Sequence, residues 1–247
     1  MLGLRAGFGS FEAEREASFF TTGGLAAVHA SGRDRKSIWE GLTKKETYGT
    51  SGDRILLWFD LIKEDKTYPM GSTTSLNVNP TFKVKAVGAF EQKDGCPDYS
   101  STNISEEEIS RICKNECYNP SDRRKNISRI EVVKITPQAI PNEKVEDLIV
   151  DVWKSFECKP SQEGCEIEFS DEAFENLSRD SIYYVRAIQE ASPVVNAGNL
   201  RCTYNEKGEC TKVNICYGDS RTDKDDDCLS LSEERAWSSP IYVNFGS

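Results

Sequence analysis

Nine cysteines, all after residue 95, constrain this chain more than any other feature of its sequence. None belongs to a Cys-x-x-Cys pair and the chain has a single histidine, so the cysteines are not expected to be zinc ligands. Neighbouring cysteines instead enclose short polar stretches, which is typical of disulfides in an oxidising compartment. We therefore expect a periplasmic or extracellular protein in which three consecutive pairs are bridged, namely Cys158 with Cys165, Cys202 with Cys210, and Cys216 with Cys228.

Three cysteines remain after this pairing. Cys96 is expected to bridge to Cys113 or Cys117, and the spacing leaves the choice open, with Cys117 included in our predicted set. Each short bridge would stabilise the fold by roughly 2–3 kcal/mol, because it restricts the unfolded chain.

Length and charge exclude several classes of protein. A chain of 247 residues suffices for one large or two small domains. The formal net charge of -10 repels nucleic acid and anionic membranes, and no apolar run approaches the roughly 20 residues that span a bilayer. The opening "MLGLRAGFGSFEAEREASFF" lacks the features of an export signal, so an exported chain of this kind is expected to be the tail of a longer protein.

The first part of the chain, residues 1–65, is predicted to form a β-α-β unit. "GGLAAVHA" has the pattern of a buried strand, and a helix over 34–48 follows, capped by Ser31 or Asp34 and ended by Gly49. An apolar stripe of this helix is expected at Ile38, Trp39 and Leu42. Exposure of Ile38 and Leu42 in the folded chain would indicate that the rest of a barrel, which would cover this apolar stripe, lies outside the chain. "RILLWFDLI" is apolar on both faces, which predicts a central strand.

The second part, residues 66–247, alternates with period two. In "TFKVKAV", Phe82, Val84 and Ala86 are expected to face inward while Lys83 and Lys85 face water. Further strands are predicted at 129–136, 147–153, 181–189 and 239–245, separated by long polar loops. Ser105 and Glu108 form a capping box for one short helix. The fold class is therefore α+β, with the β-α-β unit followed by a disulfide-linked antiparallel β-sandwich.

His29 is the first candidate site residue, since it lies where a strand leads into a helix. A metal site needs several converging donors, and no second histidine is present, so a structural side chain held by a hydrogen bond is favoured. His29 and Arg33 could still line a pocket whose other wall lies elsewhere. In "TSGDRI", the amides of Thr50–Gly52 and the guanidinium of Arg54 could hold an anion, although an ion pair of Arg54 with Asp60 or a neighbouring carboxylate is expected at least as much.

An acidic loop offers a weak calcium site. Its carboxylates are Asp219, Asp223, Asp225, Asp226 and Asp227, of which Asp223, Asp225 and Asp227 are the best candidates. The spacing lacks the glycine and the final glutamate of a helix-loop-helix calcium site, so a solvated loop between Cys216 and Cys228 is favoured.

Four aromatic residues could form a platform for sugars. They are Tyr183, Tyr184, Trp237 and Tyr242. At strand spacing such residues more often pack a sandwich core, which is the preferred interpretation.

Several strings resemble a known family. "GGLAAVHASGRDRKSIWEGLTKKETYGTSGDRILLWFDL" is similar to the closing strand, helix and strand of the PHP superfamily of metal-dependent phosphoesterases, and in particular to a bacterial branch related to carbaryl-hydrolase-like proteins and known mainly as a domain of unknown function. "YPMGS", "RDSIYYVRAIQEAS" and "ERAWSSPIYV" resemble the β-sandwich that follows the catalytic barrel in that branch.

The resemblance implies that the catalytic machinery lies outside this chain. Members of the superfamily hold Mn, Zn or Fe-type ions through His-x-His and Ser-Asp-x-His motifs in earlier barrel strands, and no such motif occurs here. No metal ligand can be transferred to a residue of this chain, which is expected to need the N-terminal barrel of its parent protein as a partner. The expected function is the C-terminal segment of an exported hydrolase of esters or phosphoesters, inactive alone; the alternative is a binding module for glycan or protein.

Overall fold

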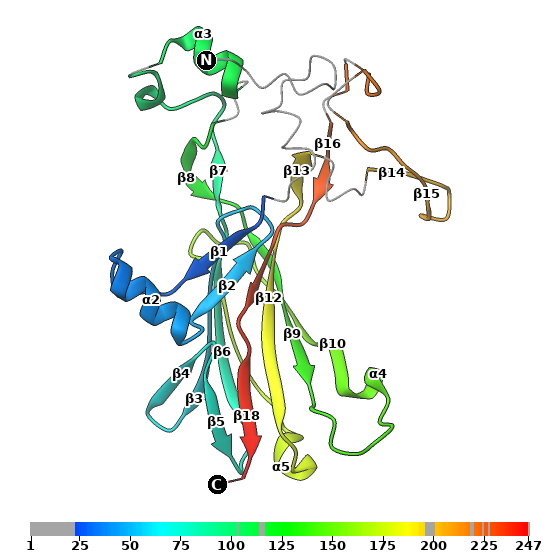
Figure 1. Cartoon of the computed structure of the whole chain (residues 1–247). Helices are drawn as coiled ribbons and strands as arrows, with labels where there is room; N and C mark the ends of the chain where they lie inside the picture. Colours follow the sequence, from blue (N-terminus) through cyan, green and yellow to red (C-terminus); the bar gives the residue numbers. More distant parts are fainter. Residues whose placement is uncertain are drawn as a thin grey trace. The chain divides into compact units, whose positions relative to one another are not determined.

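The computed structural model of the chain describes residues 23–102, 104–113, 117–195, 201–217, 220–223, 225–226 and 228–246 (Figure 1). They divide into two compact units. The first, which we name the sandwich unit, comprises Gly24–Gln92, Pro120–Glu190 and Glu234–Ser247. The second, the loop unit, has its described residues at Gly23 and within Lys93–Asn119 and Ala191–Glu233.

The larger sheet of the sandwich unit has eight strands and is built around β12 (Ser181–Gln189). β12 pairs antiparallel with β9 (Ile127–Ile135) on one side and with β17 (Arg235–Ser238) and β18 (Ile241–Phe245) on the other. The sheet also contains β1 (Leu25–Val28), β2 (Thr47–Thr50), β5 (Thr73–Leu76) and β10 (Ile149–Glu157). Only the pair of β5 with β18 is parallel among these described strands.

The smaller sheet packs against the larger one and completes the sandwich. Its four strands follow the order β11 (Cys165–Ser170), β6 (Thr81–Val87), β3 (Leu56–Lys63) and β4 (Lys66–Pro69). Phe82 lies at the centre of the core, with its ring centroid 5.5 Å from that of Phe59, 5.2 Å from Phe169 and 4.7 Å from Tyr183. The antiparallel β-sandwich that the alternating pattern predicts is confirmed, including the inward residues of β6.

The remaining elements are short. In the sandwich unit they are α2 (Arg35–Thr43), α4 (Val145–Leu148), α5 (Phe174–Leu177) and the antiparallel pair of β7 (Phe90–Gln92) with β8 (Pro120–Arg124). In the loop unit they are η1 (Asp98–Ser101), α3 (Glu106–Cys113), the pair of β13 (Ser192–Val195) with β16 (Leu229–Ser232), and the pair of β14 (Cys202–Tyr204) with β15 (Cys210–Val213). Within the described ranges, every helix is too short or too polar to cross a bilayer.

The predicted β-α-β unit is not arranged as in an α/β barrel. Its two strands, β1 and β3, lie in different sheets, and β1 instead pairs antiparallel with β2. The helix ends at Thr43 rather than near residue 48, because Lys45 adopts a left-handed backbone with a φ of 61° and the following residues join the sheet. Residue 65, the predicted boundary, lies between β3 and β4, which pair as a hairpin. The assignment of residues 1–65 to a barrel remains a prediction.

Strand β3 lies inside its sheet but buries only one face. It pairs with β4 on one side and β6 on the other, as a central strand should. Leu57, Phe59 and Leu61 are fully buried, whereas Trp58 on the opposite face is 36% exposed. A run of apolar residues therefore predicted the position of the strand in the sheet, and not the burial of both faces.

The four disulfides have the predicted pairs, and Cys96 pairs with Cys117. Only Cys158–Cys165 lies in the sandwich unit, whereas the other three bridges lie in the loop unit. In the described part of the loop unit, the buried hydrophobic residues are Ile109, Cys216 and Cys228. Disulfides thus stabilise the unit that has little apolar core, as they do in small secreted domains.

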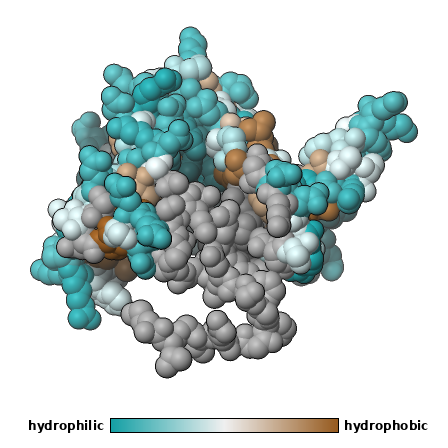
Figure 2. All heavy atoms as spheres, turned by 90° about the horizontal axis from the view of Figure 1, so that it is seen from above, coloured by the Kyte–Doolittle hydropathy of each residue, from teal (hydrophilic) through white to brown (hydrophobic). Residues whose placement is uncertain are grey.

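The described part of the surface is largely polar. Where it is coloured, the face shown in Figure 2 is mainly hydrophilic and carries small, separate hydrophobic areas. This agrees with a sequence in which 29% of the residues are charged.

Candidate functional site

His29 follows β1 and connects it to β3 by a hydrogen bond. Its Nε2 atom lies 2.8 Å from the carbonyl oxygen of Leu57, which can only accept, so Nε2 carries the proton. The half-buried ring has its centroid 5.5 Å from that of Tyr48 and 5.8 Å from that of Trp58. The imidazole is held by a backbone group and two aromatic rings.

Helix α2 approaches the strand of His29 closely at Gly41. A Cβ atom at this position would lie 2.5 Å from the carbonyl oxygen of His29 and 2.6 Å from Val28 Cγ2. Glycine is therefore needed for the helix to lie against the backbone of β1. Asp34 begins the helix by accepting hydrogen bonds from the amides of Lys36 and Ser37, which confirms it as the cap.

The outer face of β3 carries one perturbed carboxyl group beside His29. Burial raises the pKa of Asp60, and the nearby charges of His29 and Lys83 oppose this effect. An acid whose pKa is raised next to an imidazole is a pattern found in active sites and in structural clusters alike. The charge of His29 favours the ionised form of Asp60.

Arg33 and Arg54 lie in separate loops. Arg33 is exposed in the bend before α2, and Arg54 is exposed immediately before β3. The loop before Arg54 is engaged by residues of the chain itself, because the Ser51 hydroxyl donates to the Glu234 carboxylate. One of the predicted anion-binding amides is also engaged, because the amide of Ser51 donates to the Arg235 carbonyl at 2.9 Å.

Asp53 in the same loop belongs to a polar cluster. Its Oδ2 atom accepts from Lys125 Nζ at 2.7 Å and from Gln189 Nε2 at 2.5 Å. Gln189 is fully buried, and its Oε1 atom accepts the amide of Ala89 at 2.9 Å. These bonds connect four segments of the sandwich unit and leave Gln189 with both ends of its amide satisfied.

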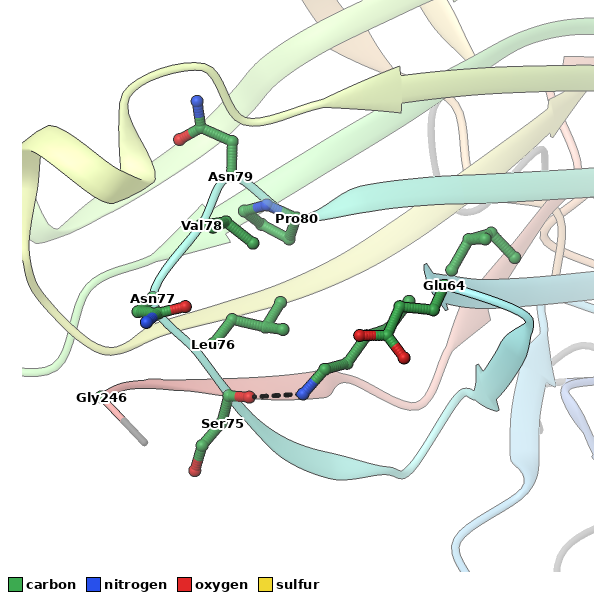
Figure 3. Close-up of a pocket in the computed structure, with 10 residues that line it drawn as sticks. Glu64, Ser75, Leu76, Asn77, Val78, Asn79, Pro80 and Gly246 are labelled. Carbon is green, nitrogen blue, oxygen red and sulfur yellow. Dashed lines mark hydrogen bonds between the residues drawn. The ribbon is translucent and has the colours of Figure 1, made fainter.

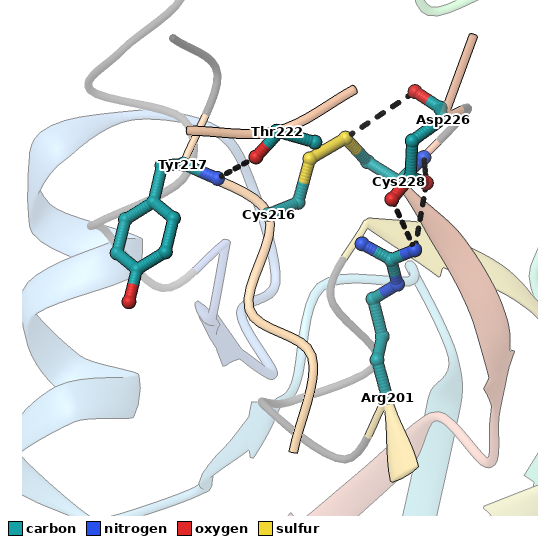
Figure 4. Close-up of a disulfide and its surroundings, with 6 residues drawn as sticks. All are labelled: Arg201, Cys216, Tyr217, Thr222, Asp226 and Cys228. Atoms are coloured by element: carbon teal, nitrogen blue, oxygen red, sulfur yellow. Dashed lines mark hydrogen bonds and ion pairs between the residues drawn. A yellow bond between two sulfur atoms is a disulfide. The ribbon is translucent and has the colours of Figure 1, made fainter. Parts of the chain in front are cut away.

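The acidic loop of the loop unit uses one carboxylate in an ion pair (Figure 4). Both oxygens of Asp226 accept from Arg201 Nη2, at 2.6 and 2.8 Å, and Oδ1 also accepts the amide of Cys228. The Arg201 hydrogen bonds are the main cause of a lowered pKa for Asp226. The Arg201 guanidinium thus occupies the position that a cation would take at Asp226, and calcium binding by this loop stays a prediction.

The best calcium candidates are not brought together by any described contact. Asp223 and Asp225 are exposed, whereas Asp219 and Asp227 lie outside the described residues. In the described part of the chain, no three side chains of His, Cys, Asp or Glu converge on one point.

The hollow shown in Figure 3 has a volume of about 490 Å³ and lies at the ends of β3 and β5. Two of its polar side chains have structural partners. Lys63 Nζ donates to the Ser75 carbonyl at 3.3 Å, and Asn79 Oδ1 accepts the amide of Glu175 at 3.0 Å, where α5 begins. The Lys63 and Asn79 side chains in this hollow therefore serve the fold.

The predicted aromatic core is correct only for Tyr183. Tyr183 pairs with Ile241 on the inner face, so Tyr184 and Tyr242 must point to the outer face of the larger sheet. Trp237 pairs with Arg186 and lies on that same outer face. Three half-buried aromatic residues thus share the outer surface with the ion pairs that Arg186 makes with Glu131 and Asp151.

Sequence reasoning missed a buried polar cluster between the two sheets. Lys134 Nζ lies 2.5 Å from Asp171 Oδ2, and the Tyr183 hydroxyl donates to the same oxygen at 2.6 Å. Lys134 is 6% exposed, Asp171 1%, and Tyr183 is fully buried. The signal in the sequence was the position of Lys134, which continues the inward-facing series of Ile130 and Val132.

The described chain is a disulfide-linked, mainly antiparallel β protein with a buried polar cluster. Two of its surfaces carry large apolar or aromatic side chains, namely α2 with Ile38, Trp39 and Leu42, and the outer face of the larger sheet. A family model described as "Protein of unknown function (DUF3604)" matches residues 5–61, which include β1, α2, β2 and most of β3. No curated protein and no solved structure matches the chain.

Proposed function

We propose that this chain is an accessory β-sandwich of an exported, PHP-type metal-dependent hydrolase, and that it docks onto the catalytic barrel of that enzyme. In this proposal the barrel holds the divalent metal ions and the ester or phosphoester substrate. The chain described here supplies a rigid surface that supports the barrel. The resemblance of its strings to that superfamily and the family-model match at residues 5–61 support the assignment.

One observation carries the docking role. On α2, inside the matched segment, Ile38 is 37% exposed, Leu42 49% and Trp39 69%. A capped helix that presents three large apolar residues to water is more typical of an interface than of a free surface. The catalytic barrel suits this surface as a partner, because an α/β barrel is surrounded by a ring of helices against which the apolar side chains of α2 can pack.

Binding to a separately produced barrel tests this proposal. The probe is the metal-binding domain of a PHP-type protein that matches the same family model, titrated with this chain. The double variant Trp39→Ser and Leu42→Ser should weaken binding by at least about tenfold, since it removes apolar anchors. Tyr204→Ser is the matched control, because Tyr204 is also exposed, at 61%, but lies outside α2.

Two results would overturn the proposal. The first is the absence of saturable binding to any such barrel. The second is hydrolysis of p-nitrophenyl phosphate or a p-nitrophenyl ester by this chain alone in the presence of Mn²⁺ or Zn²⁺, with turnover that follows the purified protein.

A second candidate function is the recognition of glycans by the outer face of the larger sheet. Tyr184, Trp237 and Tyr242 lie on this face beside the charged groups of Arg186 and Glu131. Aromatic rings next to hydrogen-bonding side chains suit the apolar faces and hydroxyl groups of sugars. Retardation of the chain in gels that contain polysaccharide, abolished by Trp237→Ala and kept in the double variant of α2, would favour this function over docking.

A further inference from the structure

The buried cluster of Lys134, Asp171 and Tyr183 contains an amine and a carboxyl group in contact. Lys134 belongs to β9 and Tyr183 to β12, where the two residues are direct cross-strand partners in the larger sheet. Asp171 follows β11 of the smaller sheet, and its amide donates to the Pro80 carbonyl at 3.1 Å. The cluster therefore joins side chains from the two layers of the sandwich.

The two oxygens of Asp171 have different partners. Oδ2 accepts from Lys134 Nζ at 2.5 Å and from the Tyr183 hydroxyl at 2.6 Å. Oδ1 accepts the backbone amide of Ala173 at 3.1 Å. One oxygen is thus surrounded by proton donors, as a leaving group requires, while the other faces a peptide N–H that can stabilise negative charge.

The surroundings of this pair are aromatic and nearly dry. Lys134 Nζ lies 5.3 Å from the centroid of the Trp153 ring and 5.8 Å from that of Tyr183, and Phe82 packs on Tyr183. An ammonium and a carboxylate lose much of their hydration in such a place. A neutral amide has a far smaller solvation demand, so this environment favours condensation of the pair and excludes the water that would reverse it.

We propose that Lys134 and Asp171 condense to an intramolecular isopeptide bond that crosslinks the two sheets. In this step Nζ gives a proton to Oδ2, and the neutral amine attacks Cγ. The negative charge that develops on Oδ1 is held by the Ala173 N–H. The C–Oδ2 bond then breaks, Nζ loses its second proton, and Oδ2 leaves with both protons as water.

Tyr183 is the catalytic residue of this step, since its hydroxyl touches the departing oxygen. Burial, followed by the hydrogen bond and charge of Asp171, raises the pKa of Tyr183. The phenol therefore keeps its proton and remains a hydrogen-bond donor to Oδ2 throughout. The reaction needs no oxidant, metal or cofactor, because an ammonium and a carboxylate contain all the atoms of the amide and the water.

The intact mass of the full chain tests the proposal. After reduction of the disulfides under denaturing conditions, the mass should be lower than the sequence mass by one water molecule. Digestion should yield a branched peptide in which the segment around Lys134 is joined to that around Asp171, with no tryptic cleavage after Lys134. A mass equal to that of the sequence would show a non-covalent ion pair and overturn the proposal.

Two variants separate this crosslink from other losses of water. Lys134→Arg keeps the positive charge next to Asp171 but cannot condense, so this variant should have the full mass of its sequence. If it still lacks one water molecule, for example because a succinimide has formed, the result counts against the proposal. Tyr183→Phe keeps the ring in the core and removes the hydroxyl, so the crosslinked fraction should accumulate several-fold more slowly. An unchanged rate in Tyr183→Phe would contradict the role given to Tyr183.

Discussion

Reduction of the disulfides should unfold the loop unit and leave the sandwich unit folded. The loop unit contains three bridges, which close segments with sequence separations of 21, 8 and 12 residues. In the chain-entropy relation, loops of this size contribute about 2.5–3.5 kcal/mol each, or about 9 kcal/mol together. That sum is as large as the whole stability of a typical domain, which is about 5–15 kcal/mol.

The sandwich unit depends far less on its bridge. Cys158–Cys165, with a separation of 7 residues, contributes about 2.5 kcal/mol by the same relation. Its core contains many fully buried apolar side chains, including Phe59, Phe82 and Val132. The difference between the units therefore comes from where the apolar core lies, and reduction should reveal it.

Hydrogen exchange followed by mass spectrometry measures this difference. Peptides from 93–113 and 201–217 should lose protection after treatment with a reductant, whereas those from β9 and β12 should keep theirs. Cys158→Ser with Cys165→Ser is the control for the loss of a bridge from the sandwich. Equal loss of protection in both units, or none in the loop unit, would refute the reasoning that disulfides replace a core there.

Three further perturbations have defined outcomes. Phe82→Ala, at the centre of the stacked rings, should lower the free energy of unfolding of the sandwich by about 3–5 kcal/mol in a urea titration, and a loss below about 1 kcal/mol would contradict its central packing. Lys83→Ala removes an ion pair with Glu166 whose side chains are 46% and 50% exposed, so the same titration should change by at most about 1 kcal/mol. The Arg179 hydrogen bonds, aided by the amides of Ala139 and Ile140, lower the pKa of Glu143 from 4.5 to about 2. The ionised carboxylate therefore stabilises the loop of residues 137–144 above pH 4.5, and this stabilisation is lost as the pH falls toward 2. An NMR titration of Glu143 checks this value, and Arg179→Gln should bring it back toward 4.5.

Part of the fold could be predicted because it depends on neighbours in sequence. The alternation of Phe82 and Val84 with Lys83 and Lys85 predicted β6, since a strand places successive side chains on opposite faces. Asp34 could be identified as a cap because its partners, Lys36 and Ser37, lie within one turn.

The site could be predicted less well, because it depends on partners distant in sequence. Lys134 and Asp171 are 37 residues apart, and nothing in either segment indicates the other. The acidic run makes Asp226 a calcium candidate, whereas Arg201, which binds it, lies 25 residues earlier. Alternation also could not show which face of β12 points inward, so Tyr184 was expected in the core.

The sequence by itself determined three of the disulfide pairs, the strand-rich character and the apolar stripe of α2, because spacing and periodicity act over a few residues, whereas the partner of Cys96 stayed open. Tertiary structure alone decided that β1 and β3 lie in different sheets and that most of the disulfides belong to the unit with little apolar core. It also decided that Lys134 contacts Asp171 inside the sandwich. These outcomes depend on which strands pair and which faces pack, and burial then decides the chemistry of each side chain.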